Sequence, residues 1–166
     1  MSKASVEDIK LESNGLRGQL AEQFADTSLS HVPDDSNILL KFHGSYQQDN
    51  RDVRAERSKA KLDKDWSFMI RSKMPGGRIT AKQYLIHDDL CTKAMGNLRL
   101  TNRQGIQLHG VLKGGLKEVI HNVCHSGLST MGACGDVVRN TMGPAAPIKD
   151  AAHADAQKLT EEISQR

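Results

Sequence analysis

The alternation of apolar and polar positions in the first third of the chain predicts short elements. Residues 5–25 predict a helix that Ser5 caps, with an apolar stripe formed by Ile9, Leu16, Leu20 and Phe24. Residues 26–37 contain a proline among polar side chains and predict a loop. The apolar run 37–42 predicts a short strand. Residues 46–57 are very polar and have little periodicity, which is typical of a solvated loop or a frayed helix.

The pattern becomes regular after Trp66. Residues 67–73 predict a strand and residues 80–94 a helix, with a proline–glycine turn between them. Two further strands are predicted at 97–103 and 106–113, and their tight link predicts a hairpin. A helix over 116–126 follows. The order strand, helix, strand, strand, helix predicts an α+β fold of the ferredoxin-like kind, an antiparallel sheet with helices on one face.

The C-terminal part begins with a stretch rich in Gly, Ala and Pro. Residues 127–147 predict a loop, with a short extended piece at 136–140. Residues 151–164 predict a final amphipathic helix.

One face of the three predicted strands carries basic and polar side chains, because side chains alternate across a strand. That face holds Arg71, Lys73, Arg99, Thr101, Arg103, Gln107 and His109. A half-solvated antiparallel sheet is the ordinary interpretation of such alternation. Solvated faces usually mix charge signs, however, and this one has no Asp or Glu. It therefore predicts a ligand with several carboxylates or phosphates. The sequence has no glycine-rich phosphate loop, which points away from nucleotides.

Composition narrows the choice of function. The chain has 166 residues, about one domain, and a formal net charge of +3. Its apolar stretches are too short for a membrane span or a secretory signal. Three cysteines without a paired motif predict a reducing compartment. Only 4% of residues are aromatic, so nucleic-acid binding remains a minor alternative.

Three other features admit two interpretations each. His121 and His125 stand four residues apart on a predicted helix, a spacing that can bind a metal, although an exposed helix surface is the more ordinary interpretation. We expect His43 to be structural and Cys91 to be a core thiol.

Five segments, taken together and in order, resemble a known enzyme family. They are KFHGSYQQDNR at 41–51, MIRSKMPGG at 69–77, LRLTNRQ at 98–104, QLHGVLK at 107–113 and GACGDVVRN at 132–140. They resemble the assimilatory sulfite and nitrite reductases, which are siroheme and iron–sulfur enzymes, over roughly residues 8–165. Residues 130–136 and 144–147 are most similar to ferredoxin-dependent sulfite reductases. The departures are Val138, where a polar residue is usual, and Ile106 and Leu108, where aromatic residues are common.

The resemblance implies roles for residues that match the family's motifs. Arg71 and Arg139 match the arginines that bind the oxyanion substrate. The siroheme carboxylates would be held by Arg99, Thr101, Asn102, Arg103, Gln107, His109 and Asn140. The implied organisation is a helix and wrapping arm at 1–64, a ferredoxin-like half-domain at 65–128, and the start of a siroheme domain at 129–166.

The resemblance also implies siroheme, a [4Fe–4S] cluster, sulfite as substrate and reduced ferredoxin as electron donor. The cluster needs four thiolates, which three scattered cysteines cannot supply. We therefore expect the chain to be the N-terminal part of a cytoplasmic or plastid reductase, with its cluster ligands in the remainder of the polypeptide. A fragment of a nitrite reductase and a truncated, non-catalytic siroheme-binding module are the alternatives.

Overall fold

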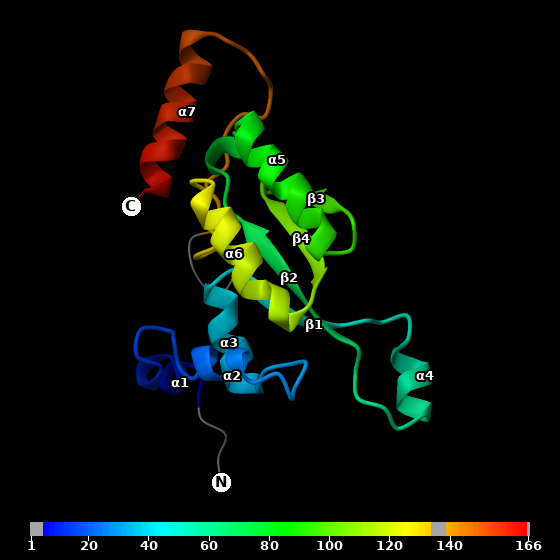
Figure 1. The fold of residues 1–166 in the computed structure, drawn as a ribbon. Coiled ribbons are helices and arrows are strands. Elements are labelled where there is room, and N and C mark those ends of the chain that lie inside the picture. Colours follow the sequence, from blue (N-terminus) through cyan, green and yellow to red (C-terminus); the bar gives the residue numbers. More distant parts are fainter. Residues whose placement is uncertain (1–4, 134–138, 166) are drawn as a thin grey trace.

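The computed structural model describes residues 5–133 and 139–165. Its centre is a four-stranded antiparallel sheet in the order β1-β2-β4-β3 (Figure 1). The strands are β1 (Ser45–Asp49), β2 (Trp66–Ser72), β3 (Leu98–Leu100) and β4 (Ile106–Val111). The α-helices are α1 (Val6–Glu12), α2 (Leu20–Ala25), α3 (Asp34–Phe42), α4 (Arg54–Lys59), α5 (Ala81–Leu90), α6 (Leu116–His125) and α7 (Ala151–Ser164). Short 3₁₀ turns stand at Pro75–Gly77, Cys91–Lys93 and Lys113–Gly115.

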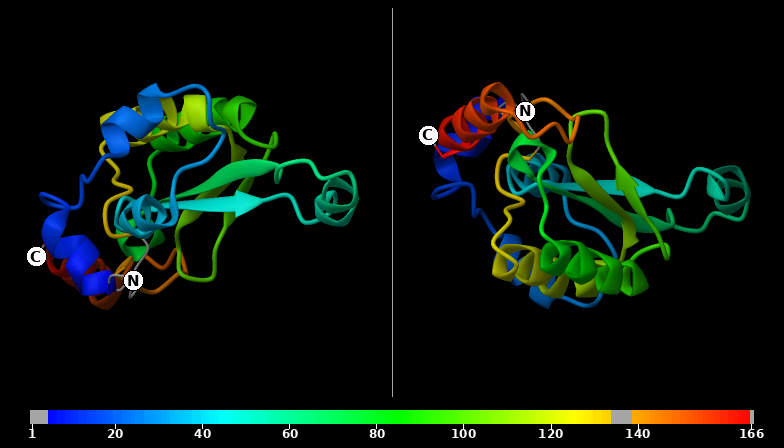
Figure 2. Two further views of the ribbon diagram at one scale, coloured as in Figure 1. Left: turned by 90° about the horizontal axis from the view of Figure 1, so that it is seen from below. Right: turned by 90° about the horizontal axis from the view of Figure 1, so that it is seen from above.

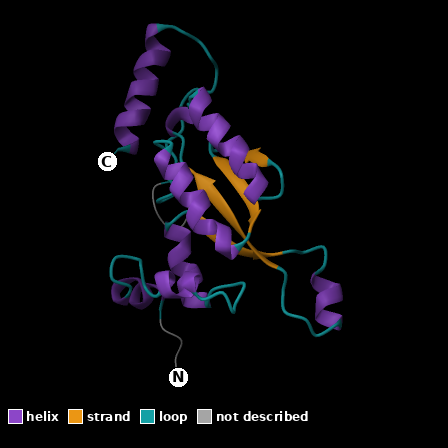
Figure 3. Cartoon of the chain, in the orientation of Figure 1, coloured by secondary structure: helices purple, strands orange, loops and turns teal. Residues whose placement is uncertain are grey.

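Helices α5 and α6 cover one face of the sheet, and the segment leading to α7 runs on the other side (Figures 1 and 2). The core lies between the sheet and these two helices. Its side chains with at most 2% exposure include Phe68, Ile70, Leu108, Val111, Leu116, Val119 and Val123. Helices and antiparallel strands are thus segregated (Figure 3), and the predicted ferredoxin-like α+β half-domain is confirmed.

The predicted strand at 37–42 is wrong, because this segment lies in helix α3. Asp34 and Asp35 occupy the first turn of α3, where the helix dipole favours negative charge. The buried side chains of α3 are Ser36, Leu39, Leu40 and Phe42, a helical spacing. The run of consecutive apolar residues resembled a buried strand, and such short runs do not distinguish the two structures by period alone.

The predicted single helix at 5–25 is divided into α1 and α2. Ser5 caps α1 as predicted, and its hydroxyl accepts a hydrogen bond from the Asp8 backbone N–H at 3.2 Å. After Glu12, however, Gly15 and Gly18 have φ values of +71° and +47°. A Cβ on Gly18 would lie 2.7 Å from Leu39 Cδ1. The break therefore lets the segment between α1 and α2 lie directly against α3.

The polar segment 46–57 was predicted as a loop or a frayed helix. It contains most of helix α4, but it also contains most of strand β1, which was not predicted. Strand β1 pairs with β2 over its whole length, from Ser45 opposite Ile70 to Asp49 opposite Trp66. Helix α4 stands at the end of a long projection between the two strands (Figure 1). Arg54 bonds to both carboxylate oxygens of Asp49 and braces this projection.

The remaining elements agree with the sequence pattern. Strand β2, the β3–β4 hairpin, α6 and α7 stand where they were predicted, with shorter strands in the hairpin. The predicted helix at 80–94 becomes α5 followed by a 3₁₀ turn, and Thr80 and Gln83 form a capping box at its start. Most of the predicted extended piece at 136–140 lies outside the described residues.

Candidate anion-binding site

Three predicted site residues form a row across the sheet. Arg71 of β2 stands opposite Gln107 of β4, and Gln107 stands opposite Arg99 of β3. Directly paired residues point to the same side of a sheet, so all three face away from the α5–α6 core. His109 follows Gln107 by two positions on β4 and shares this side. We call the surface formed by Arg71, Arg99, Arg103, Gln107 and His109 the basic face.

Gln107 joins Arg71 to His109. With its amide oriented to suit both neighbours, its oxygen accepts hydrogen bonds from Arg71 Nη2 and, at 3.0 Å, from Arg71 Nε. Its nitrogen donates to His109 Nε2 at 3.1 Å. The opposite orientation would set an amide N–H against the guanidinium donors, which have no acceptor to offer.

Positive charge accumulates around Arg71. Burial is the main cause that lowers the Arg71 pKa, and the nearby charges of Arg139 and Arg103 lower it further, whereas Tyr46 opposes them. Arginine nevertheless stays protonated in proteins. Loss of a proton therefore does not relieve this clustered charge, whereas an anion bound there would.

The same field acts on His109. Its pKa is lowered first by burial and then by the charges of Arg99 and Arg71. His109 is consequently neutral at physiological pH and can offer one N–H without adding to the positive charge.

A hollow of about 250 Å³ opens on the basic face. It is lined by Arg71, Thr101, Asn102, Arg103 and Gln107. A small adjoining cavity of about 10 Å³ is lined by Arg71, Ser72, Thr101, Arg103, Gly105, Ala133, Arg139 and Asn140. Among the described residues, no carboxylate lines either space. The structure therefore brings together all of the predicted site residues, with Arg99 and His109 beside the hollow on the same face.

Asn140 reaches the site, but its amide is engaged with backbone groups. Its nitrogen donates to the carbonyl oxygens of Arg103 and Gln104 at 2.9 and 3.0 Å, and its oxygen accepts from the Met74 N–H at 2.9 Å. Asn140 therefore ties the hairpin turn to the end of β2. This contact holds Arg139, the preceding residue, beside Arg71.

Gln104 was not among the predicted site residues, yet it supports the same loop. Its side chain makes two hydrogen bonds to the backbone of Gly143, at 2.7 and 3.0 Å. Gln104 has a φ of +57° in the hairpin turn, which directs its side chain toward residues 139–143. Its place between two predicted strands was the only signal in the sequence.

Gly44 brings a second loop to the site. A Cβ on Gly44 would lie 2.1 Å from the Thr130 carbonyl oxygen, so no larger residue fits there without moving the backbone. The Gly44 carbonyl accepts from the Arg71 N–H at 2.9 Å, and the Lys73 N–H donates to the Ser129 carbonyl at 2.7 Å. Residues 129–133 are thereby held along the end of β2, which carries Arg71.

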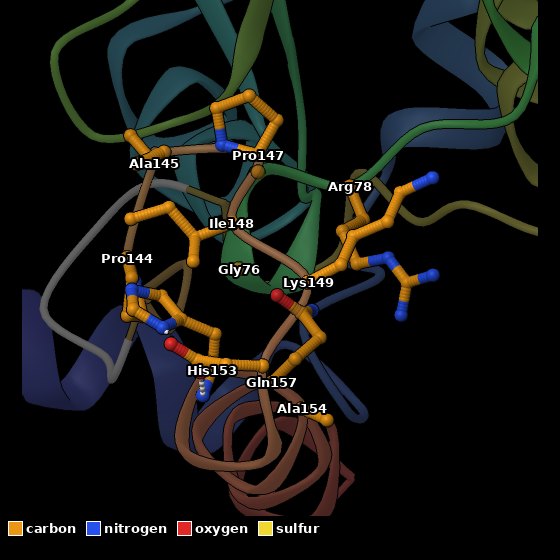
Figure 4. Close-up of a pocket in the computed structure, with 13 residues that line it drawn as sticks. Gly76, Arg78, Pro144, Ala145, Pro147, Ile148, Lys149, His153, Ala154 and Gln157 are labelled. Carbon is orange, nitrogen blue, oxygen red and sulfur yellow. Dashed lines mark hydrogen bonds and ion pairs between the residues drawn. The ribbon is translucent and has the colours of Figure 1, made fainter.

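The larger hollows lie elsewhere. One of about 560 Å³ is formed by the Pro75–Gly77 turn, residues 144–150 and the start of α7 (Figure 4). His153 Nδ1 lies 2.7 Å from Asp150 Oδ1 there. A groove of about 620 Å³ with a mainly apolar lining lies between α2 and α6. Neither contains a predicted site residue.

The alternative metal site has only two ligands. The rings of His121 and His125 stack with their centroids 5.9 Å apart on the exposed side of α6. Within residues 5–133 and 139–165, no group of three or more metal-ligating side chains is assembled. In the same ranges, no helix is long and apolar enough to cross a membrane.

Comparison with known proteins agrees with the fold. Residues 61–123 match the nitrite/sulfite reductase ferredoxin-like half domain. The "sulfite reductase [NADPH] hemoprotein beta-component" of Geobacillus kaustophilus is 48% identical over 162 residues, 97% of this chain and 28% of that protein. The protein of the same name from Bacillus subtilis is 44% identical over 164 residues, covering 98% of this chain and 29% of its own length.

A solved structure shares the fold. The Mycobacterium tuberculosis NirA protein superposes with a TM-score of 0.74 and 21% identity, covering 99% of this chain and 32% of that one. This chain thus spans less than a third of the length of the relatives it matches. Its central region is similar to the nitrite/sulfite reductase ferredoxin-like half domain, and nearly the whole chain is similar to part of the sulfite reductase hemoprotein subunits named above.

Proposed function

We propose that this chain is the N-terminal part of a siroheme-dependent sulfite reductase, and that its basic face holds the cofactor's carboxylates and the sulfite anion. The observation that carries the proposal is the row Arg71–Gln107–Arg99, with Arg103 and Arg139 beside it and no described carboxylate lining the hollow. Identity of 44–48% to sulfite reductase subunits supports sulfite over nitrite. The three-part division at 64/65 and 128/129 remains a prediction.

The residues present fit siroheme. Siroheme is a macrocycle with many carboxylates, and planar guanidinium groups bind carboxylates through paired hydrogen bonds. Arg99 and Arg103 are exposed on the basic face, and Thr101, Asn102 and Gln107 add polar groups beside them. When bound, siroheme and its linked cluster supply the electrons for the six-electron reduction of sulfite to sulfide.

A [4Fe–4S] cluster does not fit within this chain. The sequence has three cysteines, one fewer than the usual ligand set. Cys91 donates to the His87 carbonyl at 3.3 Å, and burial raises its thiol pKa, which disfavours the thiolate that binds metal. The cluster ligands are therefore expected in the remainder of the polypeptide.

In this mechanism the protein binds and orients sulfite and stabilises the negative charge that develops on its oxygens. Arg71 and Arg139 neutralise the doubly charged sulfite and hold its oxygens. Cations at this position also stabilise negative charge on an oxygen as it leaves and becomes water. Asn140, Gln104 and Gly44 keep Arg139 and Arg71 in place through the backbone contacts described above.

The two indications of the electron donor differ. The resemblance to ferredoxin-dependent enzymes predicts reduced ferredoxin, whereas the relatives reported above are named for NADPH. Assays of sulfite reduction by the complete enzyme, run in parallel with reduced ferredoxin and with NADPH as electron source, would show which donor it uses.

The experiment is an exchange of segments. This chain replaces the matching segment of the Bacillus subtilis hemoprotein, and sulfite turnover is measured together with siroheme content. We expect Arg71→Ala and Arg139→Ala to lower turnover at least 10²-fold with siroheme still bound. An Arg78→Ala variant, which removes an exposed arginine outside the basic face, serves as the control. Unchanged turnover in both site variants would contradict the proposal.

A further inference from the structure

The amide of Gln107 is already engaged within the protein. Its oxygen accepts from two nitrogens of Arg71, and its nitrogen donates to His109 Nε2 at 3.1 Å. An amide engaged on both sides is poorly placed to be a primary ligand of a carboxylate. The contacts of Gln107 instead join two other groups of the basic face.

The contact to His109 fixes a tautomer. An amide nitrogen can only donate, so His109 Nε2 must be the unprotonated ring nitrogen that accepts. The ring proton then stands on Nδ1. Protonating Nε2 as well would set two N–H donors against each other. The charged groups that face His109 are Arg99 on β3 and Arg71 on β2, and both also disfavour a positive ring.

The contact to Arg71 fixes the orientation of its guanidinium group. A guanidinium that bonds through both Nε and one Nη to a single oxygen is held along its edge. The rest of its donor set then points away from β4. Gln107 thus orients the guanidinium of Arg71 on one side and fixes the neutral N–H donor of His109 on the other.

We propose that Gln107 is a positioning residue, which orients the Arg71 guanidinium and holds His109 as the neutral Nδ1-protonated tautomer. The consequence for siroheme rests on the proposed function. An anion bound at the basic face would meet an oriented cation, Arg71, and an uncharged N–H donor, His109. The state of His109 itself is a property of this chain alone and can be measured without cofactor or substrate.

The experiment is nitrogen-15 NMR of the histidine rings in this 166-residue chain, followed from pH 8 to pH 5. His109 is assigned by its loss in His109→Gln. We expect the wild-type ring to show an unprotonated Nε2 at neutral pH and to titrate at a lower pH than a free histidine. Gln107→Glu keeps an acceptor for Arg71 but removes the donor to His109, so the titration of His109 should move to higher pH.

Two further variants separate this role from general effects of charge or folding. Gln48→Glu adds the same charge to the same side of the sheet on β1, at an exposed position, and should leave the His109 tautomer unchanged. Gln107→Met, similar in size but without either bond, should give a mixture of tautomers. A protonated Nε2 in the wild type, or an unchanged ring in both Gln107 variants, would overturn the proposal. Siroheme content of the exchange protein, measured separately, reports on the proposed function.

Discussion

The two faces of the sheet are stabilised in opposite ways. On the inner face, Phe68 and Val111 stand opposite each other and are fully buried against helices of the same chain. On the outer face, Arg71, Gln107 and Arg99 form a row of polar and positive groups. The inner face is thus buried against other parts of the chain, whereas the hollow on the outer face is lined by arginines and by no carboxylate among the described residues. Stability and binding are therefore expected to depend on different residues of the same strands.

The largest effect is expected from breaking the inner face. Phe68→Ala should lower the free energy of unfolding by about 3–5 kcal/mol, because a buried aromatic side chain is replaced by a cavity. Urea denaturation followed by circular dichroism measures it. Leu100→Ala, at a position 70% exposed on β3, is the matched control and should change stability little. Leu100 also lies on the inner side of the sheet, opposite Ile106, but it is exposed. Equal losses in both variants would therefore contradict burial as the source of the effect.

A smaller effect is expected from pH, through His87 on the inner side. His87 is fully buried and its pKa is lowered chiefly by burial, while Nε2 lies 2.9 Å from the Ser72 hydroxyl. The folded protein therefore disfavours a proton that the unfolded chain binds near pH 6.5. Stability should be complete above that pH and fall progressively below it.

The urea midpoint at pH 7.5 and 5.5 measures this dependence. His109 contributes in the same direction, because its pKa is also lowered. His87→Gln should reduce the difference between the two midpoints, whereas His125→Gln, at an exposed position of α6, should preserve it. A midpoint that rises on acidification in the wild type would be inconsistent with a buried neutral His87.

The smallest effect is expected from the outer face. Arg103→Gln removes one exposed charge next to Arg71 and should change stability by no more than about 0.5 kcal/mol. The direction should be stabilising at low salt, since like charges repel, and the gain should fade in high salt. Thermal unfolding at two salt concentrations tests this, and a clear loss of stability would show that Arg103 supports the fold rather than a ligand.

Strong local patterns allowed much of the fold to be predicted. In β4, Ile106 and Leu108 alternate with polar residues, and in β2 the apolar run that contains Phe68 and Ile70 is flanked by Ser67 and Arg71. Both strands lie where these patterns placed them. In α7, Asp150 caps the predicted start of the helix. These elements share a feature: their residues favour the same structure locally that the fold imposes.

Elements that depend on distant partners were missed. Nothing within residues 45–49 distinguishes a strand from a polar loop, because β1 is specified by its pairing with β2. The break between α1 and α2 depends on backbone angles at Gly15 and Gly18, which a stripe of apolar residues does not reveal.

The candidate site likewise contains residues that local sequence pattern predicted and residues that it did not. The residues of the basic face share one side of predicted strands, and the structure places them together. The supporting residues were not predictable, because Gln104 acts on Gly143 and Gly44 on Thr130, across long separations in sequence. Tyr46 favours the charged form of Arg71 and raises its pKa. It was not predicted as a site residue, because strand β1, which contains it, was not predicted.

The central claim is that the outer face of the sheet binds siroheme, and siroheme content tests it most directly. The exchange protein is purified from cells that make siroheme, and the visible absorption per polypeptide is recorded for three forms. We expect full content in the unaltered form, full content in Lys82→Ala/Lys117→Ala, which removes two cations from the opposite helices, and a large loss in Arg99→Ala/Arg103→Ala. Full siroheme content in the Arg99→Ala/Arg103→Ala form would contradict the account.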